Sequence, residues 1–105
     1  MALVQELHTI VWSPKALKSY EEILQYIEGE FNDIAVQKFV RKTLTMLAHI
    51  ARDPAMFRKS DKGKHKHIVV VTEKTTLYYR VKPRKREVQL LLFWDNRRNP
   101  NHLDY

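Results

Sequence analysis

The hydrophobic period of this chain changes once, near residue 52, and this change limits the possible folds more than any other feature. Over residues 14–50 apolar side chains recur every three or four positions, as on one face of an α-helix. Over residues 67–94 they recur at every second position, which is typical of β-strands. Helices followed by strands predict an α+β domain in which helices and sheet form separate layers.

The first half begins with a short predicted strand and an amphipathic helix. Residues 8–12 are β-branched and aromatic, as in a strand. Ser13 can cap a helix, Pro14 fits its first position, and Gly29 is a place for it to end. Its apolar stripe consists of Leu17, Tyr20, Leu24 and Ile27.

A second amphipathic helix follows after a short link. Asn32 or Asp33 can cap its start, and it must end before Asp53 because the residue before a proline avoids helical geometry. Its apolar stripe consists of Val36, Phe39, Val40, Leu44, Leu47 and Ile50. Two consecutive helices joined in this way predict an antiparallel helical hairpin.

Three strands joined by short turns are predicted in the second half. Residues 67–72 form an apolar run, which suits a strand buried on both sides. Residues 77–82 and 88–94 alternate between inward and outward positions, with one face of the last strand formed by Val88, Leu90, Leu92 and Trp94. Residues 73–75 and 83–86 supply the turns, so the three strands form an antiparallel meander.

The expected fold is one domain over residues 1–105 with the order β-α-α-β-β-β. In it, a helical hairpin packs on one face of a four-stranded antiparallel sheet. The last two strands also place apolar side chains such as Tyr78, Leu91 and Phe93 on the other face. An apolar sheet face either marks an interface or is covered by the C-terminal tail, and both explanations stay open.

Positive charge is concentrated in the second half of the chain. Residues 1–51 hold 5 basic and 6 acidic side chains, whereas residues 52–105 hold 14 basic and 6 acidic ones. This asymmetry is typical of a protein that meets a polyanion, although solvated loops are the alternative explanation. The candidate nucleic-acid-binding residues are Arg58, Lys59, Lys64, Lys66, Arg80, Lys82, Arg84, Lys85 and Arg86.

Several kinds of chemistry are excluded by the residue content. The chain has no cysteine, and therefore no disulfide, no thiolate zinc site and no Cys nucleophile. His65 and His67 have the spacing of a metal pair, but no third ligand lies nearby in sequence, so we predict no metal and no cofactor. The apolar runs are too short to span a bilayer and no leader is recognised, so we expect a cytoplasmic protein without membrane contact.

The residues that remain permit metal-free cleavage of RNA through its own 2′-hydroxyl. This reaction needs a group that removes the hydroxyl proton, cations that offset charge on the phosphorane, and a proton donor for the leaving oxygen. Histidine titrates in the useful range and arginine clamps phosphate oxygens. The candidate catalytic residues are His67, Arg97, Arg98, His102 and Tyr105.

Three segments, together with the order of elements, resemble the RelE/ParE superfamily of type II toxin–antitoxin toxins over nearly the whole chain. They are WSPKA at residues 12–16, LYYRV at residues 77–81 and LLFWDNRRNP at residues 91–100. The resemblance implies one of two activities: RelE-like members cut mRNA in the ribosomal A site, and ParE-like members poison DNA gyrase. It also implies an acidic antitoxin segment that wraps the basic toxin and folds on binding.

The resemblance also assigns site residues. The ribosome-dependent nucleases use basic residues on the second strand, an arginine early in the third, an arginine after the fourth, and a C-terminal Tyr or His. The corresponding positions here are Lys66 or His67, Arg97 or Arg98, and Tyr105 or His102. The third-strand arginine is missing because Thr75 and Thr76 stand in its place, although Arg80 lies on the same strand.

The favoured function is that of a metal-independent, ribosome-dependent mRNA endoribonuclease that inhibits translation. Its partners would be a cognate antitoxin, the ribosome and mRNA. The alternatives are a ParE-like inhibitor of DNA gyrase, which the Arg97–Arg98 pair also suits, and a basic nucleic-acid-binding module without toxicity. For each of these functions, we expect Lys66, His67, Arg97 and Arg98 to share one cationic groove that binds an anionic partner.

Overall fold

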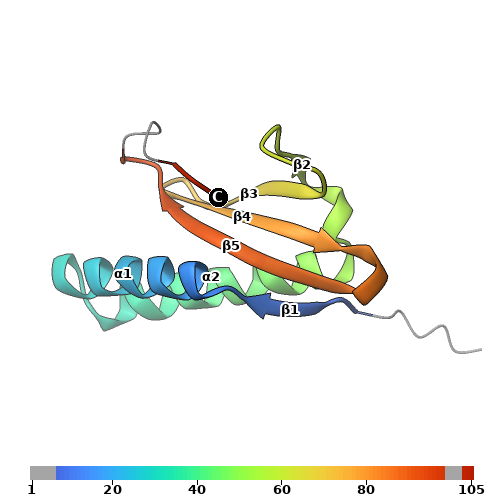
Figure 1. Cartoon of the computed structure of the whole chain (residues 1–105). Coiled ribbons are helices and arrows are strands. Elements are labelled where there is room, and N and C mark those ends of the chain that lie inside the picture. The colour runs from blue at the N-terminus through green and yellow to red at the C-terminus, as the bar shows by residue number, and fades with distance from the viewer. Residues whose placement is uncertain (1–6, 99–102) are drawn as a thin grey trace, which may run out of the picture.

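The chain folds into two layers, with both helices under one face of a single sheet (Figure 1). The computed structural model describes residues 7–98 and 103–105. Helix α1 spans Pro14–Glu30 and α2 spans Asp33–Arg52. The strands are β1 (Thr9–Trp12), β2 (Arg58–Lys59), β3 (Lys66–Thr72), β4 (Thr75–Lys82) and β5 (Glu87–Asp95), in the sheet order β1-β5-β4-β3-β2. The predicted α+β class and β-α-α-β-β-β order are confirmed.

The sheet differs in two respects from the expected four-stranded antiparallel one. A fifth strand, β2, lies in the basic loop and pairs antiparallel with β3. In addition, β1 pairs with β5 in parallel, so that the sheet is mixed. A strand of two residues is too short to show a period. The direction of β1 depends on the path that the helical hairpin gives the chain, which no local pattern contains.

The helix starts follow the predicted caps. The Ser13 side-chain oxygen accepts a hydrogen bond from the Ala16 N–H at 3.0 Å, and Asn32 accepts one from the Ala35 N–H at 2.9 Å. Beyond the caps, Phe39, Leu47 and Ile50 of the predicted stripe of α2 belong to the main core, whereas Leu44 is 60% exposed. The stripe is wider than the part of α2 that contacts α1 and the sheet. Within the described residues, no helix has the length and apolar character needed to cross a membrane.

The main core between helices and sheet contains a group of aromatic rings in mutual contact. The ring of Phe93 lies 5.3 Å from that of Trp12 and 4.7 Å from that of Tyr20, and Tyr20 stacks on Phe39 at 5.5 Å. The buried Tyr79 hydroxyl donates a hydrogen bond to the Pro54 carbonyl at 2.5 Å. Such contacts fix the helices on the sheet, and the hydrogen bond satisfies a polar group that would be costly to bury alone.

A β-bulge at Leu91 decides which side chains of β5 face the helices. Tyr78 is opposite Leu92 and Tyr79 is opposite Leu90, so Leu91 is an extra residue. An insertion of one residue reverses the alternation of faces. Phe93 therefore joins the main core while Leu92 packs on the opposite face. The prediction that Leu90 and Leu92 share a face is wrong for this reason.

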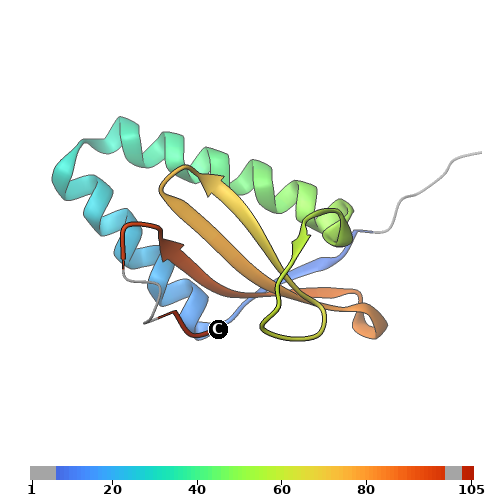
Figure 2. The ribbon, with the colours of Figure 1, turned by 90° about the horizontal axis from the view of Figure 1, so that it is seen from above.

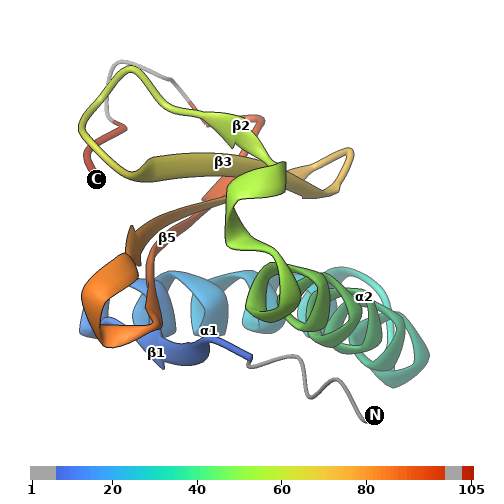
Figure 3. The same ribbon diagram turned by 90° about the vertical axis from the view of Figure 1, so that its right-hand side faces the viewer.

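The sheet face opposite the helices carries a second, smaller core. It is formed by Tyr78, Leu92 and Trp94, and Leu103 and Tyr105 of the C-terminal tail pack against it. Figure 3 shows the helices on one side of the sheet and the C-terminus on the other. Of the two explanations left open by the sequence, cover by the tail is the one observed for this part of the face.

Candidate functional site

Three predicted cations come together on the open sheet face, which is the face opposite the helices. Lys66 of β3 is directly opposite Arg80 of β4, and Arg58 of β2 is opposite Ile68 of the second core. Side chains alternate along a strand, so Lys66 lies on the same face as Ile68. Like charges directly opposite each other in a sheet destabilise it. The pair of Lys66 and Arg80 therefore favours an anionic ligand on this face.

Tyr105 completes this cluster, although it is far from the cations in sequence. Lys66 Nζ donates a hydrogen bond to the Tyr105 carbonyl at 2.9 Å and lies 5.5 Å from the centre of the Tyr105 ring. The same ring stacks on Tyr78 at 4.0 Å, and its hydroxyl lies 2.5 Å from that of Ser60. The structure thus assembles Arg58, Lys66, Arg80, Tyr78 and Tyr105, named here the open-face cluster.

The electrostatics of the open-face cluster keep Tyr78 as a neutral aromatic surface. Burial and the neighbouring Tyr105 hydroxyl raise the pKa of Tyr78, while the charge of Arg58 opposes the shift. Tyr78 is therefore protonated at neutral pH and cannot act as a base. Stacked aromatic rings flanked by cations are the elements with which proteins bind single-stranded nucleic acids.

His67 does not belong to this cluster, because its side chain points to the helix layer. It is only 4% exposed, and its ring stacks on that of Tyr79 at 5.3 Å. Its Nδ1 donates a hydrogen bond to the Phe57 carbonyl at 3.0 Å. The predicted catalytic histidine thus has a packing role in the structure, since alternation along β3 places it and Lys66 on opposite faces.

Replacement of His67 by alanine tests this packing role. We expect His67→Ala to lower the free energy of unfolding by about 1–3 kcal/mol, because it opens a cavity and leaves the Phe57 carbonyl without its donor. Urea unfolding followed by circular dichroism measures the change. The exposed His49 is the matched control, and its replacement should have almost no effect. Equal stabilities of the two variants would contradict the packing role.

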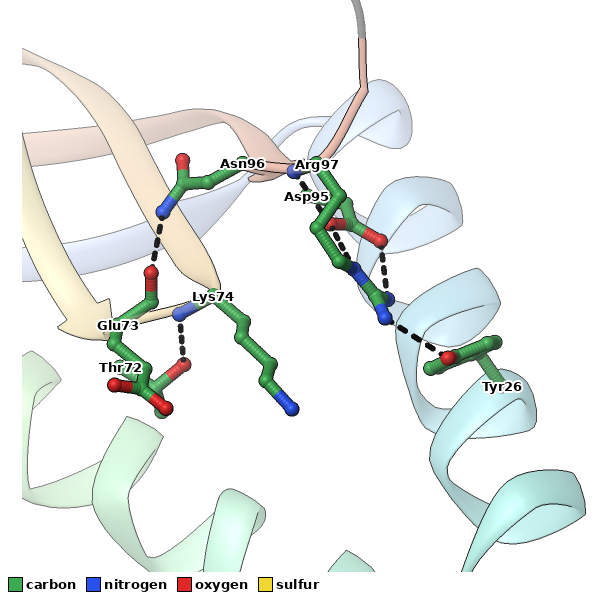
Figure 4. Close-up of polar contacts among 7 residues, drawn as sticks. All are labelled: Tyr26, Thr72, Glu73, Lys74, Asp95, Asn96 and Arg97. Atoms are coloured by element: carbon green, nitrogen blue, oxygen red, sulfur yellow. Dashed lines mark hydrogen bonds and ion pairs between the residues drawn. The ribbon is translucent and has the colours of Figure 1, made fainter.

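Arg97 lies at the other end of the sheet, held by an acid and a tyrosine (Figure 4). Its Nε and Nη2 donate to the two carboxylate oxygens of Asp95 at 2.9 and 2.7 Å, and its Nη1 donates to the Tyr26 hydroxyl at 2.8 Å. These hydrogen bonds from Arg97 hold the pKa of Asp95 below its usual value. The guanidinium is therefore held in one orientation, and its hydrogen bonds join the end of β5 to α1.

An apolar cavity of about 250 Å³ lies beside Arg97, between α1, the β3–β4 turn and the end of β5. Ile23, Ile27 and Phe93 contribute apolar lining, and Lys74 and Arg97 contribute cations. Figure 4 shows the Lys74 and Arg97 side chains on either side of the space between the turn and α1. We name this cavity the end pocket. It suits an apolar side chain that carries or adjoins a negative charge.

Asn96 ties the two sides of the end pocket together. Its backbone N–H donates to the Lys74 carbonyl at 2.8 Å and its Nδ2 to the Glu73 carbonyl at 3.2 Å, while its Oδ1 accepts from the Thr76 hydroxyl at 2.8 Å. Sequence reasoning had missed Asn96, Lys74 and Tyr26 as site residues. The one available signal was Tyr26, a large aromatic residue on the polar face of a predicted helix.

The side chain of Arg98 lies where the open face of the sheet meets the helix side. Its guanidinium lies 5.0 Å from the centre of the Trp94 ring, and its side chain also lines the end pocket. Arg80 is opposite Gln89, which precedes Asp95 by six residues. The residues after β5, Arg97 and Arg98, therefore lie roughly 20 Å along the sheet from Lys66 and Arg80. The predicted catalytic residues that the structure describes, His67, Arg97, Arg98 and Tyr105, therefore do not line one groove.

The remaining predicted cations lie on exposed segments. Lys59 and Lys64 flank the loop after β2, while the turn between β4 and β5 carries Arg84, Lys85 and Arg86. A groove beside that turn is lined by Arg80, Lys82 and His65 among others. The second basic cluster, defined here as Arg80, Lys82, Arg84, Lys85 and Arg86, thus continues from the open-face cluster. His102 lies outside the described residues. Within the part of the chain that the structure describes, no three His, Asp or Glu side chains form a group that could bind a metal.

Residues 10–100 match the model of the ParE toxin of the type II toxin–antitoxin system parDE. No curated protein matches the chain. In structure the chain is similar to the chromosomal ParDE toxin–antitoxin system of P. aeruginosa, with a TM-score of 0.71 and 13% identity over 86% of this chain and 97% of that one.

Two further solved structures share the fold. The YoeB dimer of Staphylococcus aureus matches with a TM-score of 0.56 and 19% identity, over 81% of this chain and 92% of that one. The toxin–antitoxin complex RelBE2 of Mycobacterium tuberculosis matches with a TM-score of 0.58 and 11% identity, over 88% of this chain and 94% of that one.

Proposed function

The chain belongs to the ParE toxin family of type II toxin–antitoxin systems, within the RelE/ParE superfamily, and we propose that it acts by binding and inhibiting DNA gyrase. This proposal reverses the order of preference drawn from the sequence, in which mRNA cleavage came first. It assigns the chain a binding role without covalent chemistry of its own. Both targets are cytoplasmic, and the proposed place of action is therefore the cytoplasm.

The separation of the predicted catalytic residues is the observation that carries the proposal. Cleavage of one phosphodiester requires the base, the acid and the cations to lie within hydrogen-bond reach of it. Lys66 contacts Tyr105, but Arg97 lies roughly 20 Å along the sheet from Lys66 and donates its hydrogen bonds to Asp95 and Tyr26. His67 is buried on the opposite face. This arrangement favours a protein that binds its target over one that cuts RNA.

The end pocket is the proposed contact with gyrase. Protein interfaces concentrate binding energy in a few pockets that accept an apolar or aromatic anchor, often beside an arginine. The end pocket offers apolar lining around Phe93 and a fixed guanidinium at Arg97. We propose that an apolar side chain of gyrase, next to an acidic one, occupies it.

An antitoxin is the second proposed partner. Two of the solved structures similar to this chain are described as toxin–antitoxin systems or complexes. The formal charge of +7 suits an acidic partner, since opposite charges speed association and select against wrong partners. We propose that the antitoxin is encoded by a small acidic reading frame next to the gene of this chain.

The open-face cluster favours a second candidate function, which is ribosome-dependent cleavage of mRNA. Lys66, Arg80 and Arg58 supply cations on one face, and Tyr78 and Tyr105 supply rings on which bases can stack. In that case Arg80 takes the place of the arginine that is missing at Thr75 and Thr76, and the site includes neither Arg97 nor His67.

A direct comparison of the two targets tests the proposal. The purified chain is added to gyrase in a supercoiling assay and, separately, to a translating extract in which mRNA cleavage is mapped. We expect supercoiling to be inhibited at near-stoichiometric amounts of the chain, because inhibition by binding requires one copy for each target, and we expect mRNA to remain intact. Cleaved mRNA with normal supercoiling would select the second candidate, and an effect in neither assay would contradict both.

A further inference from the structure

The outer edge of β3 is open over its second half. β2 pairs with only two residues of β3, His67 and Ile68, whereas β3 continues to Thr72. Figure 2 shows β3 running beyond the short β2 and beside α2. Within the described residues, no strand pairs with the outer edge from Val69 onward.

The direction of the backbone groups on this edge follows from the neighbouring hydrogen bonds. The carbonyl of Lys66 accepts from the Ser60 N–H at 2.8 Å on the β2 side, and the carbonyl of His65 accepts from the Val81 N–H at 2.8 Å on the β4 side. Backbone groups of successive residues point to opposite sides of a strand. Val70 has the parity of Lys66, so its N–H and carbonyl point to the open edge. Its side chain is 57% exposed.

A basic groove of about 510 Å³ lies between this edge and α2. Lys38, Arg41 and Lys42 line it together with His49, at spacings that place them on one face of the helix. Met46 and Val71 supply apolar lining. The only acid in α2 is Asp33 at its first residue, and no ion pair joins these three cations to any acid in the described part of the chain.

The open edge of β3 and the basic groove beside it would each select a different property of a ligand that binds both. An open strand edge binds another strand through main-chain hydrogen bonds, with alternate side chains on either face of the sheet. A strand added to β3 would direct every second side chain toward the groove, where acids meet Lys38, Arg41 and Lys42 and apolar groups meet Met46. A nucleic acid would use the cations but not the strand edge or the apolar lining.

We propose that an acidic, extended segment of the antitoxin adds a strand to β3 along Val69–Thr72 and places its acidic side chains in the basic groove of α2. This inference rests on the proposed function, since it takes the antitoxin as the occupant. It adds a surface, which lies on the helix side of the sheet edge, outside the open-face cluster, and which meets the end pocket at Thr72.

The charge of the groove is tested first. Binding of the purified antitoxin, encoded by the neighbouring acidic reading frame, is measured by titration calorimetry at two salt concentrations. We expect Lys42→Glu to weaken binding roughly tenfold or more at low salt and less at high salt, because salt screens charges at an exposed site. Lys85→Glu on the β4–β5 turn makes the same change of charge elsewhere and should have little effect. Equal losses in the two variants would overturn the proposal, because they would reflect net charge alone.

The strand edge is tested separately. Val70→Pro removes the N–H that the added strand needs, and an edge position tolerates proline because that N–H has no partner in the sheet. Val70→Ala shortens the side chain to a similar extent but keeps the N–H. We expect Val70→Pro to lose most of its affinity for the antitoxin and Val70→Ala to keep it.

Hydrogen exchange keeps this test independent of how well the proline variant folds. In the wild-type chain, the amide of Val70 should exchange more slowly when the antitoxin is bound. Unchanged exchange of the Val70 amide would overturn the inference while the proposed function stands. The same holds if poly(U) RNA displaces the antitoxin with equal affinity from Val70→Pro and from the wild type. A wild-type chain that binds no antitoxin would overturn the proposed partner as well.

Discussion

Replacement of Arg97 and Arg98 together by alanine is expected to abolish the growth arrest that the chain causes when it is expressed without an antitoxin. Arginine truncated at the centre of an interface weakens binding by roughly thirtyfold or more. Arg97 is held in place by Asp95 and Tyr26, and Arg98 lines the same pocket, so both lose their contact with the target. Growth after induction, together with the supercoiling assay, measures the effect.

The fold should survive this change, because the Arg97 side chain is 47% exposed and exposed ion pairs contribute little to stability. Arg84→Ala with Lys85→Ala is the matched control, since it removes the same charge from the turn at the other end of β5. We expect full growth arrest from that control. If the control is inactive and the Arg97 and Arg98 variant remains toxic, the end pocket is not the site and the second basic cluster takes its place.

Phe93→Ala is expected to have the largest effect on stability. Phe93 is 2% exposed, and its ring contacts both Trp12 and Tyr20. Removal of a phenylalanine from a packed core costs about 3–5 kcal/mol, which is a large share of the roughly 5–15 kcal/mol that stabilises a typical domain. Thermal unfolding should show the melting temperature lowered by roughly 15 °C or more.

The control for Phe93 is Leu44, an apolar residue that is 60% exposed on α2. Leu44→Ala should change the free energy of unfolding by no more than about 0.5 kcal/mol. A similar loss of unfolding free energy in both variants would show that Phe93 is no more buried than Leu44. This result would contradict the position of the bulge at Leu91. Without that bulge, Phe93 would lie on the opposite face of the sheet.

The Arg97 and Arg98 variant changes one end of the β4–β5 hairpin, and Phe93→Ala changes its middle. The hairpin of β4 and β5 carries Arg80 near one end and the residues of the end pocket at the other. Its middle holds both cores, with Phe93 on the helix side and Tyr78 on the open face. Stability thus depends on the middle of the hairpin, while the candidate contacts lie at its ends, where side chains reach solvent.

Much of the fold could be predicted from the sequence, because the signals involved are local. Ser13 and Asn32 cap the helices as their positions indicated, since a cap requires only a side-chain oxygen three residues before a free N–H. The change of period near residue 52 predicted helices before strands, and the segments at residues 77–81 and 91–100 indicated the superfamily. Each of these inferences uses residues that lie close together in the chain.

The candidate site was predicted only in part, because its geometry depends on contacts between distant segments. The cations Lys66 and Arg80 were identified by charge and do lie opposite each other. In contrast, His67 was assigned to the site from its chemistry, while its place on β3 turned it toward the core. The partners of Arg97 were not foreseen, since Tyr26 lies 71 residues away in sequence.

The sequence by itself determined the elements other than β2, their order and the sign of the charge, because side-chain periodicity and composition are properties of short segments. Only the tertiary structure decided which face each side chain occupies. A single extra residue at Leu91 reverses the faces of β5, and the tail brings Tyr105 over Tyr78. Both depend on the register between strands that are far apart in the chain, and register is set by the packing of the whole sheet.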